Sequence, residues 1–301
     1  MPNKKSVLWE NLVRTTDRAL LAGTLVPVPT HYTFIEDGGI RFFIRILTSL
    51  ARKDAARKEQ EAAAKKGMPA NPFSPPEKEL VVADISDTHL AVLNKFNVVK
   101  HHLLIITREY EDQDTLLTLK DFEALWLCMA EYKSLGFYNG GRDAGASQQH
   151  KHLQIIPIPI APEGPAIPIE PLILSAKQRS DITRQISGFE FRHTFVPLRK
   201  GLINAPYDAA RETFDIYASM LLQVGIKGPT KTGLTMQTMP YCLLVTRDWM
   251  LLVPRARECF GDISFNSLAF AGSLFARSEK QLEQIKSFRP MNALKSVAFP
   301  R

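Results

Sequence analysis

A run of prolines near the middle of the chain limits how its backbone can pair. Between Pro157 and Pro171, six prolines alternate with mostly apolar residues in the string PIPIAPEGPAIPIEP. Proline donates no backbone hydrogen bond and holds φ at about −65°, so this stretch favours extended, polyproline-like chain over a helix or a central strand. We therefore predict a semi-rigid connector that separates two structured parts.

The residues before the connector alternate between helix and strand patterns. We predict an amphipathic helix at 5–22, strands at 40–47 and 103–107, a charged helix or surface excursion at 51–67, and a helix that starts after Thr118 and ends before Gly136. The last helix is the most regular, because Thr118 and Asp121 can form a capping box and apolar residues follow at helical spacing.

The residues after the connector repeat this mixture. We predict a helix from 206 to 225, two short strands within 241–255, and two helical segments within 262–287, the second capped by Ser278. The string LIITREY at 104–110 resembles LLVTRDW at 243–249 in character, position by position. One such echo is weak, but it would fit two related halves packed edge to edge.

Composition narrows the class of protein and of partner. With 45% hydrophobic and 23% charged residues, the chain matches soluble globular averages. Without a membrane-length apolar run or a signal-peptide core, we expect a cytoplasmic protein with reduced cysteines. The net charge of +7 suits an anionic partner or simply a solvated basic surface. With no recognisable nucleic-acid-binding signature, small phosphate compounds are favoured over nucleic-acid polymers.

The string GASQQHKHLQ at 145–154 contains the chemically distinctive residues. A turn of small residues leads into a short strand that carries His150, His152 and Gln154 at alternate positions. Alternate residues of a strand face the same side, so these three form one polar, titratable row. A strand face that served packing alone would present Val, Ile or Leu. We therefore interpret the row as a site.

The row suits reactions at phosphorus. Imidazole is mostly neutral at pH 7 and is a competent nucleophile, so His152 could carry a nucleotidyl group as a phosphoramidate. Gln154 would offer an amide donor to a phosphate oxygen, and His150 would donate to the phosphate or orient its neighbour.

The turn before the row could also contact the phosphate. Gly145 and Ala146 would let backbone amides approach an anion, and the Ser147 hydroxyl could donate to the bridging oxygen of a leaving group. Three alternatives remain open from the residues alone: a metal bound by the two histidines, a pair of structural histidines, and a Ser-His-acid hydrolase.

The order Ser-x-x-His-x-His-x-Gln after Gly-Ala resembles the signature of the histidine triad superfamily, in the galactose-1-phosphate uridylyltransferase-like branch where glutamine replaces the third histidine. The whole chain resembles the diadenosine tetraphosphate phosphorylase or ATP adenylyltransferase family of that branch. The strings that carry the resemblance are NPFSPPEKELVVADISDTHLAVLNKFNVVKHHLLIITREYEDQ at 71–113, GFYNGGRDAGASQQHKHLQIIPIP at 136–159, YCLLVTRDWMLLVPR at 241–255 and FAGSLFARS at 270–278.

This resemblance implies an α+β fold with a mainly antiparallel sheet, flanking helices and two related halves. It also implies reversible phosphorolysis of diadenosine tetraphosphate to ATP and ADP through an adenylyl-histidine intermediate. By motif position, the implied site consists of His152 as the nucleophile, Gln154 and Ser147 as phosphate contacts, Asn139 in the asparagine-glycine segment, and Lys53, Asn94 and Lys95 as nucleotide-binding residues. The implied partners are diadenosine polyphosphates, ATP, ADP and phosphate, with Mg²⁺ accompanying the nucleotide.

We accordingly expect a histidine-triad-like catalytic half at 1–160, a connector at 161–185 and an ATP adenylyltransferase half at 186–301. The alternatives are a hexose-1-phosphate uridylyltransferase and a nucleotide-binding sensor without turnover. We expect no tightly bound metal, because no ligand cluster is visible in the sequence, and the sequence does not indicate an oligomeric state.

Overall fold

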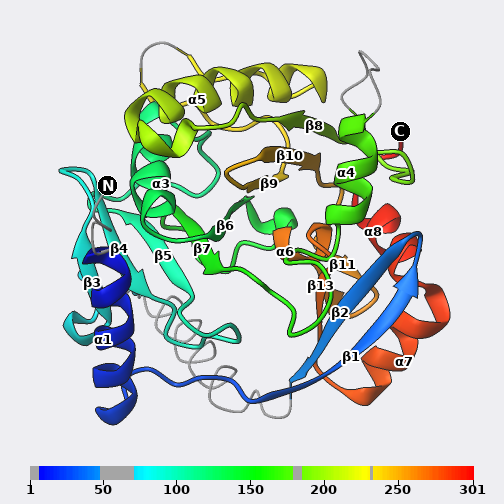
Figure 1. Ribbon diagram of the computed structural model, residues 1–301, viewed down its shortest axis with the longest axis horizontal. Helices are drawn as coiled ribbons and strands as arrows, with labels where there is room; N and C mark the ends of the chain where they lie inside the picture. The colour runs from blue at the N-terminus through cyan, green and yellow to red at the C-terminus, as the bar shows by residue number, and fades with distance from the viewer. Residues whose placement is uncertain (1–6, 48–70, 179–184, 231–232) are drawn as a thin grey trace, which may run out of the picture.

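Most strands lie in one large sheet (Figure 1). The computed structural model describes residues 7–47, 71–178, 185–230 and 233–301. In sheet order, the eight strands are β3 (Val81–Asp84), β4 (His89–Leu93), β5 (Leu103–Thr107), β7 (His152–Pro157), β6 (Ser134–Gly140), β9 (Tyr241–Val245), β10 (Trp249–Pro254) and β8 (Thr194–Pro197). Every neighbouring pair is antiparallel, which confirms the expected mainly antiparallel α+β fold.

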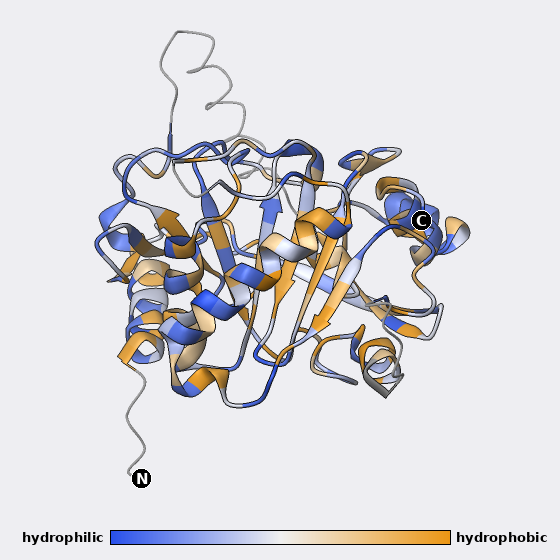
Figure 2. Cartoon of the chain, turned by 90° about the horizontal axis from the view of Figure 1, so that it is seen from above, coloured by the Kyte–Doolittle hydropathy of each residue, from blue (hydrophilic) through white to orange (hydrophobic). Residues whose placement is uncertain are grey.

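Helices cover one face of this sheet. They are α1 (Val7–Leu21), α3 (Leu119–Glu131) and α5 (Pro206–Gln223). Their apolar stripes bury one hydrophobic core against the strands, and that core includes Leu153 and Ile155 of β7. In Figure 2 the strands at the centre are coloured as hydrophobic, and many of the blue, hydrophilic stretches lie toward the outside.

A second layer covers part of the opposite face. It contains a three-stranded sheet of β1 (Thr30–Asp37), β2 (Ile40–Leu47) and β13 (Ser273–Ala276), a small pair of β11 (Cys259–Phe260) and β12 (Ile263–Ser264), and the helices α4 (Glu170–Gln178), α6 (Ser267–Phe270), α7 (Glu279–Phe288) and α8 (Pro290–Val297). Short 3₁₀ turns lie at Lys78–Leu80, Arg142–Ala144 and Leu202–Asn204. A second hydrophobic core, which includes Phe137 and Ile156, fills the space between the layers.

Most predicted elements are present. The opening helix, the strands at 40–47 and 103–107, the helix after residue 206 and the strand pair within 241–255 are all confirmed. So are the capping box of Thr118 and Asp121 and the Ser278 cap of α7. The predicted helix at 51–67 lies outside the described residues. Among the described residues, no helix has the length and apolar character needed to cross a bilayer.

Three local predictions were wrong. Gly136 does not end α3, which stops at Glu131; it lies inside β6, where a Cβ atom would approach Leu125 Cδ1 of α3 to 2.8 Å. Glycine is there because the strand passes close to the helix. Within 262–287, the first helical segment shrinks to α6 and is followed by β13. The extended connector also ends early, since α4 begins at Glu170 with a proline in its first turn, where a missing N–H is tolerated.

The two parts of the chain share one topology and meet edge to edge. In the first, β5-α3-β6-β7 follow in sequence while the sheet order is β5-β7-β6. In the second, β8-α5-β9-β10 follow in sequence with the sheet order β8-β10-β9, and β6 pairs with β9 at the junction. In this repeated topology β9 corresponds to β6, so the strings LIITREY and LLVTRDW lie on strands that are not equivalent, and their likeness does not support the two related halves. The limits of the halves at 160 and 186 stay predictions.

Candidate active site

Strand β7 presents the histidine row on the face away from the helices. Leu153 and Ile155 point into the helix-side core, so His152 and Gln154 face the other way. His150 lies just before β7, where it forms a bridge with Asp112. All three row residues are buried, with 2%, 4% and 8% of His150, His152 and Gln154 exposed. The predicted row therefore exists as one buried polar surface.

His152 is held as a neutral imidazole with a defined tautomer. Its Nδ1 lies 2.8 Å from the backbone oxygen of His150, and because a carbonyl only accepts, Nδ1 carries the proton. Burial lowers the pKa of His152 to about 4; the hydrogen bond to the backbone oxygen of His150 opposes this shift, and the neighbouring His150 ring adds a smaller lowering effect. The lone pair therefore resides on Nε2, which has no hydrogen-bond donor among the residues that the structure describes.

Both ring nitrogens of His150 are occupied. Nε2 lies 2.8 Å from the backbone oxygen of Thr107, and Nδ1 lies 2.9 Å from Asn71 Nδ2. Asn71 Oδ1 accepts from the amide of Phe73, which turns its amino group toward the imidazole. Burial lowers the pKa of His150 as well. In this arrangement His150 acts on the site through its backbone oxygen, which orients His152, and its ring has no free donor for a phosphate.

The side-chain amide of Gln154 is hydrogen-bonded to His102. His102 Nε2 lies 2.9 Å from Gln154 Oε1, and His102 Nδ1 lies 3.2 Å from Asn94 Nδ2. Asn94, predicted to bind nucleotide, is therefore directed at a protein partner. Lys95 pairs with Glu77 at 2.7 Å, and Lys53 lies outside the described residues. The structure thus gives two of the three predicted nucleotide-binding side chains a partner within the chain.

A glutamine from a loop joins the two central strands beside the row. Gln113 Oε1 accepts from the amide of His152 at 2.8 Å, while its Nε2 donates to the backbone oxygen of Asn139 at 2.8 Å. The side chain of Asn139 accepts from the amide and hydroxyl of Ser267 at 2.9 and 2.7 Å. Asn139 therefore lies on the strand beside β7 and fixes the start of α6 against the site.

The turn before the row is closely packed, and part of its backbone is already hydrogen-bonded. The amides of Gly145 and Ala146 donate to the oxygens of Arg142 and Gly141 at 2.8 and 3.2 Å, so neither is free for an anion here. Gly145 has φ of +92°, and a Cβ atom there would lie 3.0 Å from the Phe265 oxygen. Ser147 is exposed, and no residue of the described chain accepts its hydroxyl proton.

A buried ion network lies behind the row. Lys151 points to the opposite face of the strand, where its ammonium lies 2.9 Å from both Asp121 and Glu111. Although burial disfavours the charge, these carboxylates hold the pKa of Lys151 above its ordinary value. Despite burial, Lys151 and His89 hold the pKa of Asp121 well below its usual range. This network fixes the strand against the capped start of α3.

Sequence reasoning missed several supporting residues: Asn71, Phe73, His102, Thr107 and Gln113. Phe73 packs against both histidine rings of the row, with ring centroids 5.7 and 5.5 Å away. One signal could have found His102, because it shares strand alternation with Leu104, the residue opposite Gln154. Gln113 comes from a loop whose position no local pattern predicts.

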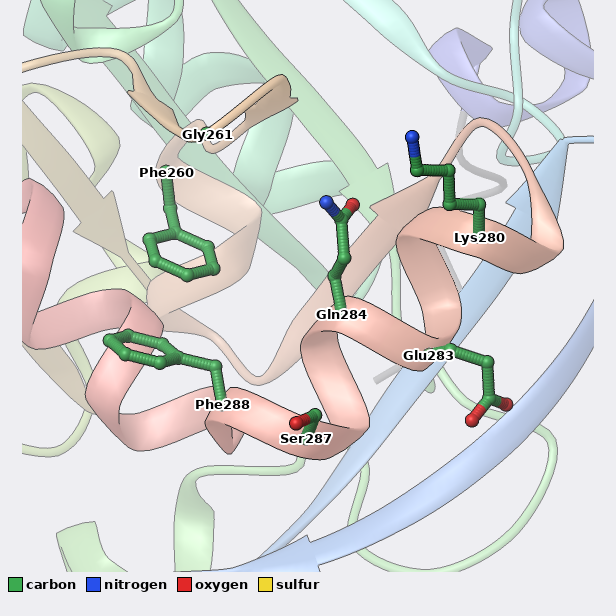
Figure 3. Close-up of a pocket in the computed structure, with 7 residues that line it drawn as sticks. All are labelled: Phe260, Gly261, Lys280, Glu283, Gln284, Ser287 and Phe288. Atoms are coloured by element: carbon green, nitrogen blue, oxygen red, sulfur yellow. The ribbon is translucent and has the colours of Figure 1, made fainter.

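Two of the alternative interpretations find no support in the geometry. Among the described residues, no group of three or more His, Cys, Asp or Glu side chains could hold a metal ion. No hydrogen bond joins Ser147 to a histidine in the described chain, as a serine hydrolase would need. A separate hollow lies at α7, where Phe260 and Phe288 stack with centroids 4.2 Å apart (Figure 3). It contains no residue of the motif, so it does not belong to the row.

Comparison with known proteins agrees with this architecture. Two family models match the chain: the Ap4A phosphorylase N-terminal domain at residues 1–175 and the ATP adenylyltransferase C-terminal domain at residues 187–300. One relative, diadenosine 5',5'''-P1,P4-tetraphosphate phosphorylase 2 of Saccharomyces cerevisiae, is 27% identical over 268 residues, which are 81% of this chain and 79% of the relative.

The fold is also similar to solved structures. The crystal structure of yeast Ap4A phosphorylase Apa2 in complex with Ap4A matches with a TM-score of 0.74 and 23% identity over 97% of each chain. The Apa2 complex with AMP matches with a TM-score of 0.75 and 22% identity over 99% of this chain and 97% of Apa2. Because the N-terminal model alone spans more than half of the 301 residues, the chain belongs to the Ap4A phosphorylase and ATP adenylyltransferase family.

Proposed function

We propose that this protein is a nucleotidyltransferase that converts diadenosine tetraphosphate and phosphate to ATP and ADP, reversibly, through an adenylyl group on His152. The observation that carries the proposal is the fixed tautomer of a buried, neutral imidazole whose Nε2 has no donor in the described chain. The relative named as a diadenosine tetraphosphate phosphorylase and the Apa2 complexes with Ap4A and AMP supply the substrate class.

The first half-reaction forms a bond between His152 Nε2 and the α-phosphorus of one adenosine. The bond from that phosphorus to its bridging oxygen breaks, and ATP leaves with the electron pair. The ring gains positive charge, which the backbone oxygen of His150 stabilises through the Nδ1 proton at 2.8 Å. The NH₂ group of Gln154 and the hydroxyl of Ser147 are proposed donors to the phosphate and to the leaving oxygen.

In the second half-reaction an oxygen of inorganic phosphate attacks the same phosphorus. The P–N bond breaks, ADP forms, and the lone pair returns to Nε2, so that the imidazole is again neutral. A divalent cation enters as part of the nucleotide, because polyphosphates in such reactions travel with Mg²⁺ held mainly by their own oxygens.

The test is to detect the covalent intermediate directly. Wild-type protein is incubated with diadenosine tetraphosphate and Mg²⁺ without phosphate, and intact mass is measured after quenching. We expect one AMP adduct, its absence in His152→Ala, and release of ADP when phosphate is added. UDP-glucose serves as a comparison substrate, and a uridylyl adduct in place of the adenylyl adduct would select a uridylyltransferase.

His193 is a matched control within the same chain. Its Nδ1 also lies 2.8 Å from the backbone oxygen two residues before it, and burial lowers its pKa to about 4 as well. Its Nε2, however, accepts from the amide of Ile186 at 2.7 Å. We therefore expect His193→Ala to keep the adduct. Loss of the adduct in both variants, or in neither, would contradict the assignment of His152.

A further inference from the structure

A relay of hydrogen bonds reaches Gln154 from the turn after β4. The amide of Phe96 donates to Asn94 Oδ1 at 3.3 Å, Asn94 Nδ2 lies 3.2 Å from His102 Nδ1, and His102 Nε2 lies 2.9 Å from Gln154 Oε1. The backbone amide of Asn94 also donates to the backbone oxygen of His102 at 3.0 Å, which ties the two residues together.

Each bond in this relay fixes the direction of the next one. A backbone amide can only donate, so the oxygen of Asn94 faces it and the amino group faces the imidazole. An amino group also only donates here, so Nδ1 of His102 accepts and the ring proton resides on Nε2. That proton is donated to the oxygen of Gln154. The NH₂ group of Gln154 is then the end of the amide that remains for the site.

The position of His102 suits this task. Only 8% of the residue is exposed, and its ring packs against Phe137 with the centroids 5.8 Å apart. Phe137 is the residue opposite Gln154 on β6, and Leu104, two residues after His102, is opposite Gln154 on β5. His102 thus holds the amide of Gln154 from a fixed place immediately before β5.

The geometry points to His102 as a positioning residue that, together with Asn94, turns the NH₂ group of Gln154 rather than its oxygen toward the α-phosphate beside His152. An amide side chain has nearly the same shape in both orientations, but a donor attracts a phosphate oxygen and a carbonyl repels it. The inference rests on the proposed function, because it takes an α-phosphate to lie at the row. It also assigns Asn94 the role of orienting Gln154 through His102, instead of a direct contact with nucleotide.

The test is a double-mutant cycle on the single-turnover rate of adenylyl-enzyme formation. If Gln154 donates at the transition state, Gln154→Ala should slow this step by about 100-fold. His102→Phe keeps a ring but loses the donor, and we expect about a 10-fold loss, the size of one net hydrogen bond. The double variant should be about as slow as Gln154→Ala alone, because the effect of His102 passes through Gln154.

Asn94 is tested in the same way. Asn94→Ala should slow the wild type by a few-fold and change the Gln154→Ala background by less than about 2-fold. If the two losses in rate multiply, so that the double variant with His102→Phe and Gln154→Ala is about 1000-fold slower than the wild type, the positioning role is overturned. A loss from Asn94→Ala that persists without Gln154 would instead place Asn94 on the nucleotide and remove it from the relay. Affinity for AMP, measured by calorimetry, should change less than the rate, because the amide acts mainly on the transition state.

Two controls separate this inference from the proposed function and from general damage. His193→Phe replaces another buried histidine, outside the row, and should keep the rate within about 3-fold, as for a substitution away from the reacting groups. A readout without turnover uses the wild-type protein labelled with ¹⁵N-histidine. NMR should show the His102 proton on Nε2, and a proton on Nδ1 overturns the relay. If the wild type forms no adenylyl-enzyme while this tautomer is found, the proposed function fails and the relay stands as structure alone.

Discussion

The buried lysine inside the histidine motif gives a quantitative test of how the site is supported. Lys151 contacts Asp121 and Glu111 at 2.9 Å and donates to the backbone oxygen of Leu116 at 3.0 Å. Lys151→Met preserves much of the side-chain length and removes the charge. Asp121, whose side chain is 1% exposed, would then remain buried without its cation. We expect a large loss in the free energy of unfolding.

The size of this loss in the free energy of unfolding depends on the hydrogen-bond partners that Asp121 retains in Lys151→Met. Removing one partner of a buried ion pair typically costs about 3–5 kcal/mol. Asp121 still accepts from the amide and the hydroxyl of Thr118 at 2.7 Å each and contacts His89 Nε2 at 3.1 Å. Glu111 has a 26% exposed side chain and can turn toward water. We therefore expect the lower end of the range, about 3 kcal/mol.

The assay is urea unfolding followed by circular dichroism at pH 7, with Lys120→Met as the matched control. Lys120 has a 63% exposed side chain and pairs with Glu123 at 2.8 Å, so its removal should cost less than about 1 kcal/mol. Equal losses in the two variants, or a loss below about 1 kcal/mol for Lys151→Met, would refute the reasoning.

The pH dependence of the same experiment has a defined sign. Lys151 helps to hold the pKa of Asp121 below its usual value. A depressed carboxyl pKa contributes stability above the unfolded pKa, about 3.9, and that contribution is lost as the pH falls through the folded pKa. The difference in stability between the wild type and Lys151→Met should therefore shrink as the pH falls below about 4.

Four further predictions concern the proposed nucleophile, two glycine turns and the helix layer. Because the pKa of His152 is lowered to about 4, the rate of adenylyl-enzyme formation at saturating substrate should show no loss from protonation of His152 until the pH approaches that value; a fall centred near 6.5 would contradict a buried neutral nucleophile. Gly145→Ala forces a Cβ to 3.0 Å from a backbone oxygen at φ of +92° and should slow adenylyl transfer by about 10-fold or more, since small displacements of positioning groups are costly. Gly225→Ala, at φ of +82° with open space around the Cβ, should cost about 1 kcal/mol in urea unfolding and leave the rate unchanged. Thr213→Val removes the acceptor of Trp126 Nε1 at 2.8 Å and should lower stability by about 1–3 kcal/mol, measured by the same unfolding assay with activity as the control.

Local patterns predicted the elements whose stabilisation is local. The capping box that starts α3 and the Ser278 cap of α7 depend on residues three positions apart, and sequence alone reveals them. Gly136 misled the prediction, because glycine both ends helices and permits close packing, and only the arrangement of β6 against α3 decides between these uses. Strands β8 and β13 are short and gain their stability from neighbours distant in sequence, so no periodicity marked them.

Strand alternation predicted the row, but it did not predict the residues that support the row. Alternation placed His152 and Gln154 on one face, and the structure agrees. The sequence suggested that the backbone amides of Gly145 and Ala146 could approach an anion, whereas in the structure both N–H groups donate to oxygens of the 3₁₀ turn before them. The ring of His150 is engaged by Thr107 and Asn71, partners that lie 43 and 79 positions away in sequence. Contacts at such separations depend on the order of the strands, which the sequence does not state directly.

Residues of both halves support the row. Strand β7 belongs to the first half, yet Ser267 from the second half holds the side chain of Asn139. The fully buried guanidinium of Arg255 donates to the backbone oxygens of Ala144 and Phe265, with Nη1 at 3.4 and 2.9 Å. One residue of the second half therefore bonds both to the turn that precedes the row and to the loop that packs against Gly145. Strands β6 and β9 occupy equivalent places in the two halves and pair at the junction, and their pairing keeps these supports in register with the row.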